Sequence, residues 1–173
     1  YLSFSRILFG NSEIDDVAFH PIYGLLLTPV GWLDGQSLHT SALLLNSVLA
    51  GLIVYCAVRF SERLRANRMV VYTCGTIAAL YPASTSASRI GWAETLITLI
   101  VLVIALLLAK GDTFSWCLSG LLAALGVAVH PRMIVSMVAV YLVAICCRRF
   151  KHVSWGALPG LVITTILLSV TRA

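Results

Sequence analysis

Six apolar runs follow one another along this chain, and their lengths constrain its fold more than any other feature. A bilayer core of about 30 Å needs about 20 helical residues to cross it. The runs cover 38–60, 69–83, 92–109, 113–129, 133–147 and 154–171. They predict an all-α fold, a polytopic integral membrane bundle of about six transmembrane helices.

Composition agrees with a membrane location. Hydrophobic residues make up 60% of the 173 residues and charged residues only 11%, whereas soluble domains are about 25% charged. The mean hydropathy is +0.96. A soluble domain of this size has too little interior to bury so much apolar surface. We therefore exclude a water-soluble enzyme, a secreted disulfide scaffold and a disordered tail, and we expect the lipid bilayer to be a partner.

The positive charges lie in short clusters between the apolar runs, so the net charge of +5 indicates membrane topology and no nucleic-acid partner. The dense clusters fall in 61–68 and 148–152, and cytoplasmic loops of membrane proteins are enriched in Lys and Arg. We predict that both segments, and the turn at 110–112, are cytoplasmic in a multi-pass protein of the cell or inner membrane. The amino-terminal acids, Glu94 and Arg132 then lie on the outer side.

The first 37 residues differ from the rest because they are only partly apolar. We expect 1–37 to be an outer-face loop with interfacial helices and 38–173 to be the transmembrane bundle. Within the loop, HPIYGLLLTPVGWL has about 14 residues, too few to cross a bilayer comfortably, and is predicted to be an interfacial or re-entrant segment beside the first span. The chain opens on Tyr1, so we expect a fragment of a longer protein.

Ionisable residues beside apolar spans are costly unless they are hydrated or paired, which makes them candidates for function. Glu94 lies in the first turn of the run that begins at 92. One interpretation is a carboxylate favoured by the helix dipole. The other is a carboxylate in an outward cavity, paired with Arg89 or another cation and facing a polar substrate.

A second candidate is the corner His130-Pro131-Arg132, which joins two runs on the outer side. Pro stops a helix and Arg at headgroup level needs no further role. The alternative is a phosphate site, because a guanidinium offers planar, bidentate donors.

The amino-terminal loop adds weaker candidates. Asp15 and Asp16 are either a metal or general-base pair or simply solvated acids, and His20 is either an interfacial polar residue or a substrate contact. The sequence has no nucleotide-binding glycine loop, no metal-ligand His pair and no nucleophile elbow. We predict no metal and no cofactor.

Three strings, taken in order, resemble the amino-terminal transmembrane half of GT-C-fold glycosyltransferases. Tyr1 to Gly10 followed by HPIYGLLLTP is similar to the first outer loop of the family and its continuation. The string LYPA with Glu94-Thr95-Leu96 is similar to a second stretch, and GLLAALG leading to His130-Pro131-Arg132 is similar to a third. The resemblance covers roughly residues 1–145.

The resemblance implies glycosyl transfer on the outer membrane face, with a polyprenyl-phosphate-linked sugar as the donor substrate. Arg89, His130 and Arg132 would contact the phosphate, and Glu94 would face the substrate. The catalytic acid of the family usually lies upstream of the position of Tyr1, so the general base is expected outside this chain. Asp15 and Asp16 lie in the right loop but at the wrong place in the pattern.

Two other functions remain open at this stage. One is a small-solute transporter, although only Pro159-Gly160 resembles a broken helix, and it lies near the end of its predicted span. The other is a non-catalytic membrane subunit, in which Gly120 and Gly126 would allow close packing against other subunits or the rest of its own chain.

Overall fold

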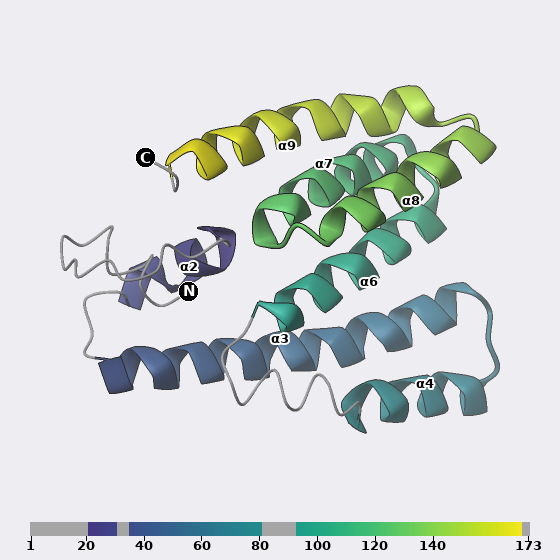
Figure 1. Ribbon diagram of the computed structural model, residues 1–173. Helices are drawn as coiled ribbons and strands as arrows, with labels where there is room; N and C mark the ends of the chain where they lie inside the picture. Colours follow the sequence, from purple (N-terminus) through teal and green to yellow (C-terminus); the bar gives the residue numbers. More distant parts are fainter. Residues whose placement is uncertain (1–20, 31–34, 81–92, 171–173) are drawn as a thin grey trace.

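The computed structural model describes residues 21–30, 35–80 and 93–170 (Figure 1). Over these ranges the chain forms only helices, which confirms the all-α fold class. The α-helices are α2 (Pro21–Leu27), α3 (Gly35–Arg63), α4 (Arg68–Leu80), α6 (Glu94–Lys110), α7 (Thr113–Val129), α8 (Met133–Cys146) and α9 (Phe150–Val170). A short 3-10 helix, η1 (Thr28–Val30), follows α2 directly.

Each predicted apolar run overlaps one of the helices from α3 to α9, and the parts of the runs at 81–83, 92 and 171 lie outside the described residues. The bounds of α7 are those predicted, since the Asp112 side chain accepts a hydrogen bond from the backbone N–H of Ser115 at 2.7 Å and caps the first turn. Helix α9 begins earlier than predicted, at Phe150, and so includes the polar residues Lys151 and His152. Polar side chains at a helix end do not interrupt it, which is why hydropathy alone placed this start too late.

Length separates the helices into two classes. Over Gln36–Arg63 and Phe150–Ser169, α3 and α9 are long and apolar enough to cross a membrane. At 1.5 Å per residue, the 13 residues of α4 and the 14 of α8 extend only about 20 Å, less than a bilayer core of about 30 Å. The described residues therefore contain two candidate spans, and the arrangement with six spans stays a prediction.

The outer surfaces of the two long helices are apolar. Only 28% of the most apolar stretch of each is buried, which is unlike the core helix of a soluble protein. Leu44 and Val48 of α3 and Leu158 and Ile166 of α9 are all more than half exposed. Apolar surface of this extent is typical of a helix that faces lipid or another apolar partner.

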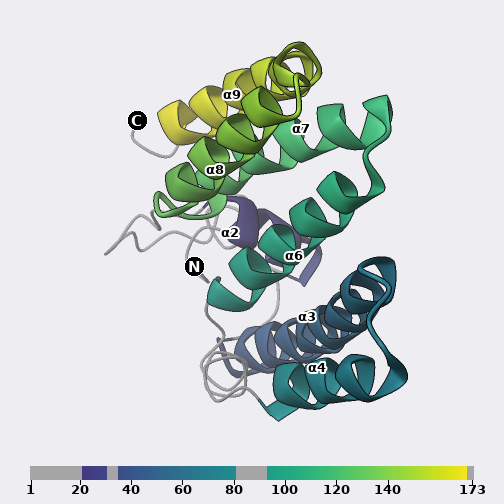
Figure 2. The same ribbon diagram turned by 90° about the vertical axis from the view of Figure 1, so that its right-hand side faces the viewer.

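Helix α6 lies between two groups of helices in both views (Figures 1 and 2). On one side is the pair α3 and α4, and on the other are α7, α8 and α9. Two buried clusters fill the spaces between them. The first joins α2, α3, the start of α6 and the end of α7, and the second joins α6, α7, α8 and α9.

Glycines bring α7 and α9 into backbone contact, and the two helices run parallel. A Cβ at Gly156 would overlap the carbonyl oxygen of Cys117, and one at Gly120 would overlap that of Val153. The Thr164 hydroxyl also donates to the carbonyl of Ala124 at 2.9 Å. Small residues permit this approach, and interhelical hydrogen bonds in membranes contribute about 1 kcal/mol.

These contacts bear on the alternatives left open by the sequence. Gly120 packs inside the chain against α9 and Gly126 packs against Met133, so neither glycine offers a surface to another subunit. Pro159 lies in the middle of α9, not near the end of a span, and the helix continues through it. The expectation that Pro159 lies near the end of a span was wrong, because the predicted run of 154–171 omitted the first turn of the helix. Gly160 packs against α7.

All three turns with predicted cytoplasmic charge lie at the same end of the bundle (Figure 1). These are the turns α3–α4, α6–α7 and α8–α9, and each contains one residue with a positive φ: Arg65 at 57°, Gly111 at 77° and Arg148 at 57°. The start of α6 and the turn between α7 and α8 lie at the opposite end. The charged turns lie at one end because the two helices that each turn joins run in opposite directions. The side of the membrane that this end faces remains a prediction.

Candidate functional site

The site begins at Glu94, the first residue of α6. Its Oε2 atom is buried and has no hydrogen-bond partner in the described part of the chain, and the same holds for Oγ1 of the neighbouring Thr95. Thr95 is only 1% exposed. Buried polar atoms without partners are rare in folded proteins, and two of them follow one another at this helix start.

The end of α7 lies against this helix start. Ala93, which precedes Glu94, and Val129, which precedes His130, belong to the same buried cluster, and both are fully buried. The structure therefore brings the beginning of α6 and the corner after α7 together at one end of the bundle. The sequence predicts that both segments lie on the outer side of a membrane, and that side stays a prediction.

The corner itself has a defined geometry. Nδ1 of His130 accepts a hydrogen bond from the backbone N–H of Arg132 at 3.1 Å, which requires Nδ1 to be unprotonated and places the ring proton on Nε2. The His130 carbonyl accepts from the Met133 N–H at 2.9 Å and starts α8. Arg132 is exposed. The corner thus presents one exposed guanidinium, a group that suits a phosphate oxygen.

An apolar groove runs between α3, α4 and α6, close to Glu94 along α6. It encloses about 470 Å³, and its lining is almost entirely apolar. Thr98 lies in this lining one turn after Glu94, and its hydroxyl donates to the Glu94 carbonyl at 2.9 Å. We call this space the α3–α4–α6 groove; it is lined by Ile53, Ala57, Cys74, Ile77, Ala78, Ile97, Thr98, Val101 and Leu102.

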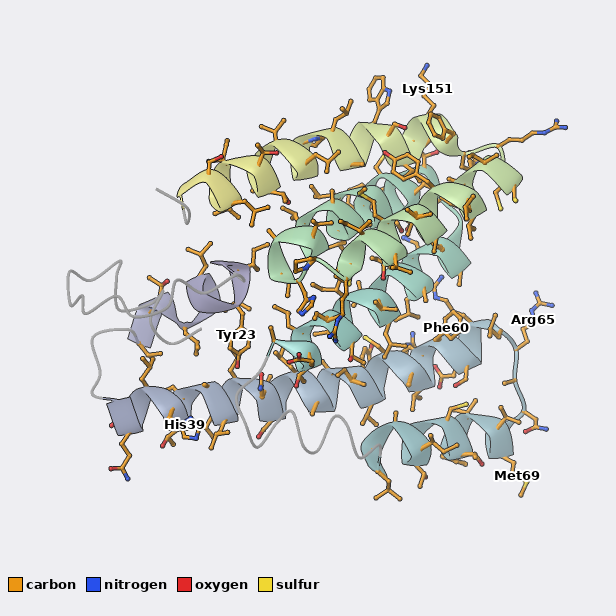
Figure 3. The ribbon with its side chains drawn as sticks, viewed as in Figure 1. Tyr23, His39, Phe60, Arg65, Met69 and Lys151 are labelled. Carbon is orange, nitrogen blue, oxygen red and sulfur yellow. The ribbon has the colours of Figure 1, made fainter. Side chains whose placement is uncertain are left out.

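A buried polar pair supports the same end of the bundle. The Tyr23 hydroxyl of α2 donates to Oδ1 of Asn46 in α3 at 3.0 Å, and both side chains are fully buried. Figure 3 shows Tyr23 pointing from α2 toward α3. The sequence analysis missed Asn46 and Thr95. The signal for Asn46 was a single amide in an otherwise apolar run.

Four of the sequence candidates, Asp15, Asp16, His20 and Arg89, lie outside the described residues. Of the others, Glu94 stands at the start of α6, and His130 and Arg132 stand at the corner after α7. Within the described ranges, no group of three or more His, Cys, Asp or Glu side chains could hold a metal ion.

Comparison with protein-family models, curated proteins and solved structures finds no match to this chain.

Proposed function

We propose that this chain forms the membrane-embedded part of a GT-C-type glycosyltransferase that takes a sugar from a polyprenyl-phosphate donor. The observation that carries the proposal is the buried, unpartnered carboxylate oxygen of Glu94 beside the His130 and Arg132 corner. In the proposal, substrate hydroxyl groups supply the hydrogen bonds that the described residues do not offer this carboxylate.

In this proposal the donor lipid binds in two parts. Arg132 contacts the phosphate at the corner that it forms with His130, and the α3–α4–α6 groove takes the first isoprene units. The groove suits an isoprenoid because its lining is apolar and its volume is about 470 Å³. Burial of apolar surface contributes roughly 25 cal/mol per Å².

Sugar transfer then follows ordinary displacement chemistry. The acceptor hydroxyl forms a bond to the anomeric carbon, the bond from that carbon to the phosphate oxygen breaks, and the phosphate leaves with the electron pair. The hydroxyl proton passes to a carboxylate base, which we assign to no described residue. The Arg132 guanidinium stabilises the charge that develops on the leaving phosphate. Glu94 positions the sugar by accepting hydrogen bonds from its hydroxyl groups.

The test is sugar transfer from radiolabelled polyprenyl-phosphate hexoses and pentoses in membranes that contain the full-length protein, including the segment expected to supply the base. We expect Arg132→Ala to lower kcat/KM roughly 10- to 100-fold, since a charged hydrogen bond to phosphate is worth about 1.5–3 kcal/mol. Glu94→Gln should lower it by a similar factor. Arg68→Ala, at the opposite end of the bundle, is the matched control and should retain the wild-type value.

Two results would contradict the proposal. Wild-type transfer by the Arg132→Ala protein would remove Arg132 from the site. Absence of transfer by the wild-type protein from every polyprenyl-phosphate sugar, with correct membrane insertion, would overturn the proposed activity itself.

A further inference from the structure

The end of the bundle that carries the three basic turns has more cations than acids to pair with them. In the described ranges, Glu62 is held by Arg59 at 2.8 Å and Asp112 by Lys110 at 2.8 Å. Six further cations have no ion pair there, and all but Arg149 are exposed. We call them the basic rim: Arg63, Arg65, Arg68, Arg148, Arg149 and Lys151. Figure 3 shows Arg65 and Lys151 projecting at this end.

Two of the rim arginines occupy backbone positions that favour glycine. Arg65 and Arg148 both have φ of 57°, in the left-handed region. At each position, a backbone hydrogen bond spans the left-handed residue and closes the last turn of the preceding helix. The Ala66 N–H donates to the Ser61 carbonyl at the end of α3, and the Arg149 N–H donates to the Ala144 carbonyl at the end of α8. Helix ends of this kind usually place Gly in the left-handed position.

The third turn at this end shows the usual solution. Gly111 has φ of 77° at the end of α6. Glycine adopts this conformation without a steric penalty, whereas arginine does not. Arginine at the other two turns is therefore less favourable for the backbone than glycine would be.

Large apolar side chains surround the basic rim. Leu64, Met69, Phe150 and Trp155 are each more than half exposed, and Nζ of Lys151 lies 5.9 Å from the centre of the Trp155 ring. Exposed apolar groups next to cations match the headgroup level of a bilayer, where aromatic rings and basic side chains concentrate. Guanidinium groups bind phosphate oxygens in bidentate fashion.

We propose that Arg65 and Arg148 bind the headgroup phosphates of anionic phospholipids, so that the basic rim selects these lipids at one face of the membrane. The proposal rests on membrane insertion, which the proposed function also assumes, and does not depend on sugar transfer. The occupant is a phospholipid and not a soluble polyanion, because the cations stand beside exposed apolar side chains.

The experiment compares lipid binding to the purified protein in neutral detergent, with phosphatidylglycerol and phosphatidylcholine as the probes and native mass spectrometry as the readout. We expect the wild-type protein to bind phosphatidylglycerol roughly tenfold more tightly. The double variant Arg65→Gly with Arg148→Gly should lose most of this preference. Its midpoint of thermal unfolding in phosphatidylcholine should equal or exceed that of the wild type, because glycine relieves the backbone.

A matched double variant controls for net charge. Arg59→Gln with Lys110→Gln also removes two cations from the same end, but both are already paired with acids. This protein should keep the phosphatidylglycerol preference. The proposal is overturned if the glycine variant keeps the preference, if the control loses it equally, or if the glycine variant unfolds at a lower temperature in phosphatidylcholine. Binding of a soluble oligonucleotide in competition with phosphatidylglycerol would also overturn it.

Discussion

Single side chains at the helix ends decide where the elements of this protein begin. Asp112 receives hydrogen bonds from Lys110 and from the Ser115 backbone N–H, and together they lower the pKa of its carboxyl group to about 2. Its charged form is therefore favoured in the folded protein. A carboxyl pKa that falls on folding contributes stability above the unfolded pKa, and this stability is lost as the pH falls through the folded pKa.

This shift gives a prediction for Asp112→Asn. The amide can still accept from Ser115 but cannot pair with Lys110 as a charge. We expect the variant to unfold a few degrees below the wild type at pH 6, and the difference to disappear between pH 4 and pH 2, where the wild-type carboxyl becomes protonated. Circular dichroism in detergent measures both midpoints. A difference that persists unchanged at pH 2 would contradict the role of the charge.

The polar residues of the site were predictable to different degrees. Glu94 stood out because it begins an apolar run, and His130 and Arg132 because they follow one. Thr95 could not be distinguished from a lipid-facing threonine, since its burial depends on neighbours from other helices. Tyr23 and Asn46 lie 23 positions apart, and their hydrogen bond exists only once α2 packs on α3.

The sequence predicted the individual helices closely, but it did not predict which helices pack against each other. Asp112 and Pro131 bracket α7, so its bounds of 113 and 129 could be predicted. Its pairing with α9 could not, because Gly120 and Gly156 belong to separate runs and hydropathy treats every apolar face alike. The close backbone contact at these glycines depends on both helices together, so the sequence of one apolar run cannot predict it.

The contact between α7 and α9 predicts the effect of one methyl group. Gly156→Ala places a Cβ against the Cys117 carbonyl and forces the helices apart, so we expect a loss of about 1–3 kcal/mol in the free energy of unfolding. Gly51→Ala in α3 is the control, since nothing lies within 4 Å of its Cβ position. Equilibrium unfolding in mixed micelles measures both variants. Equal stability of the two would show that α7 and α9 are not in this contact.

The molecule as a whole has one end with basic turns and another with Glu94, His130 and Arg132, with apolar helices between them (Figures 1 and 3). Both long helices expose large apolar side chains, consistent with lipid around them. The proposed sugar transfer and the proposed lipid selectivity both depend on this polarity, because one uses the end with Glu94 and the other uses the end with the basic turns.

Cysteine accessibility tests this polarity most directly. Cys147 is exposed at the basic end and His39 is exposed near the start of α3, at the opposite end (Figure 3). Two proteins with one cysteine each, native Cys147 or His39→Cys, are treated in sealed cells with a maleimide that cannot cross membranes. We predict that only the His39→Cys protein is labelled before permeabilisation and that Cys147 is labelled after it. Labelling of Cys147 in sealed cells, with His39→Cys protected, would contradict the account.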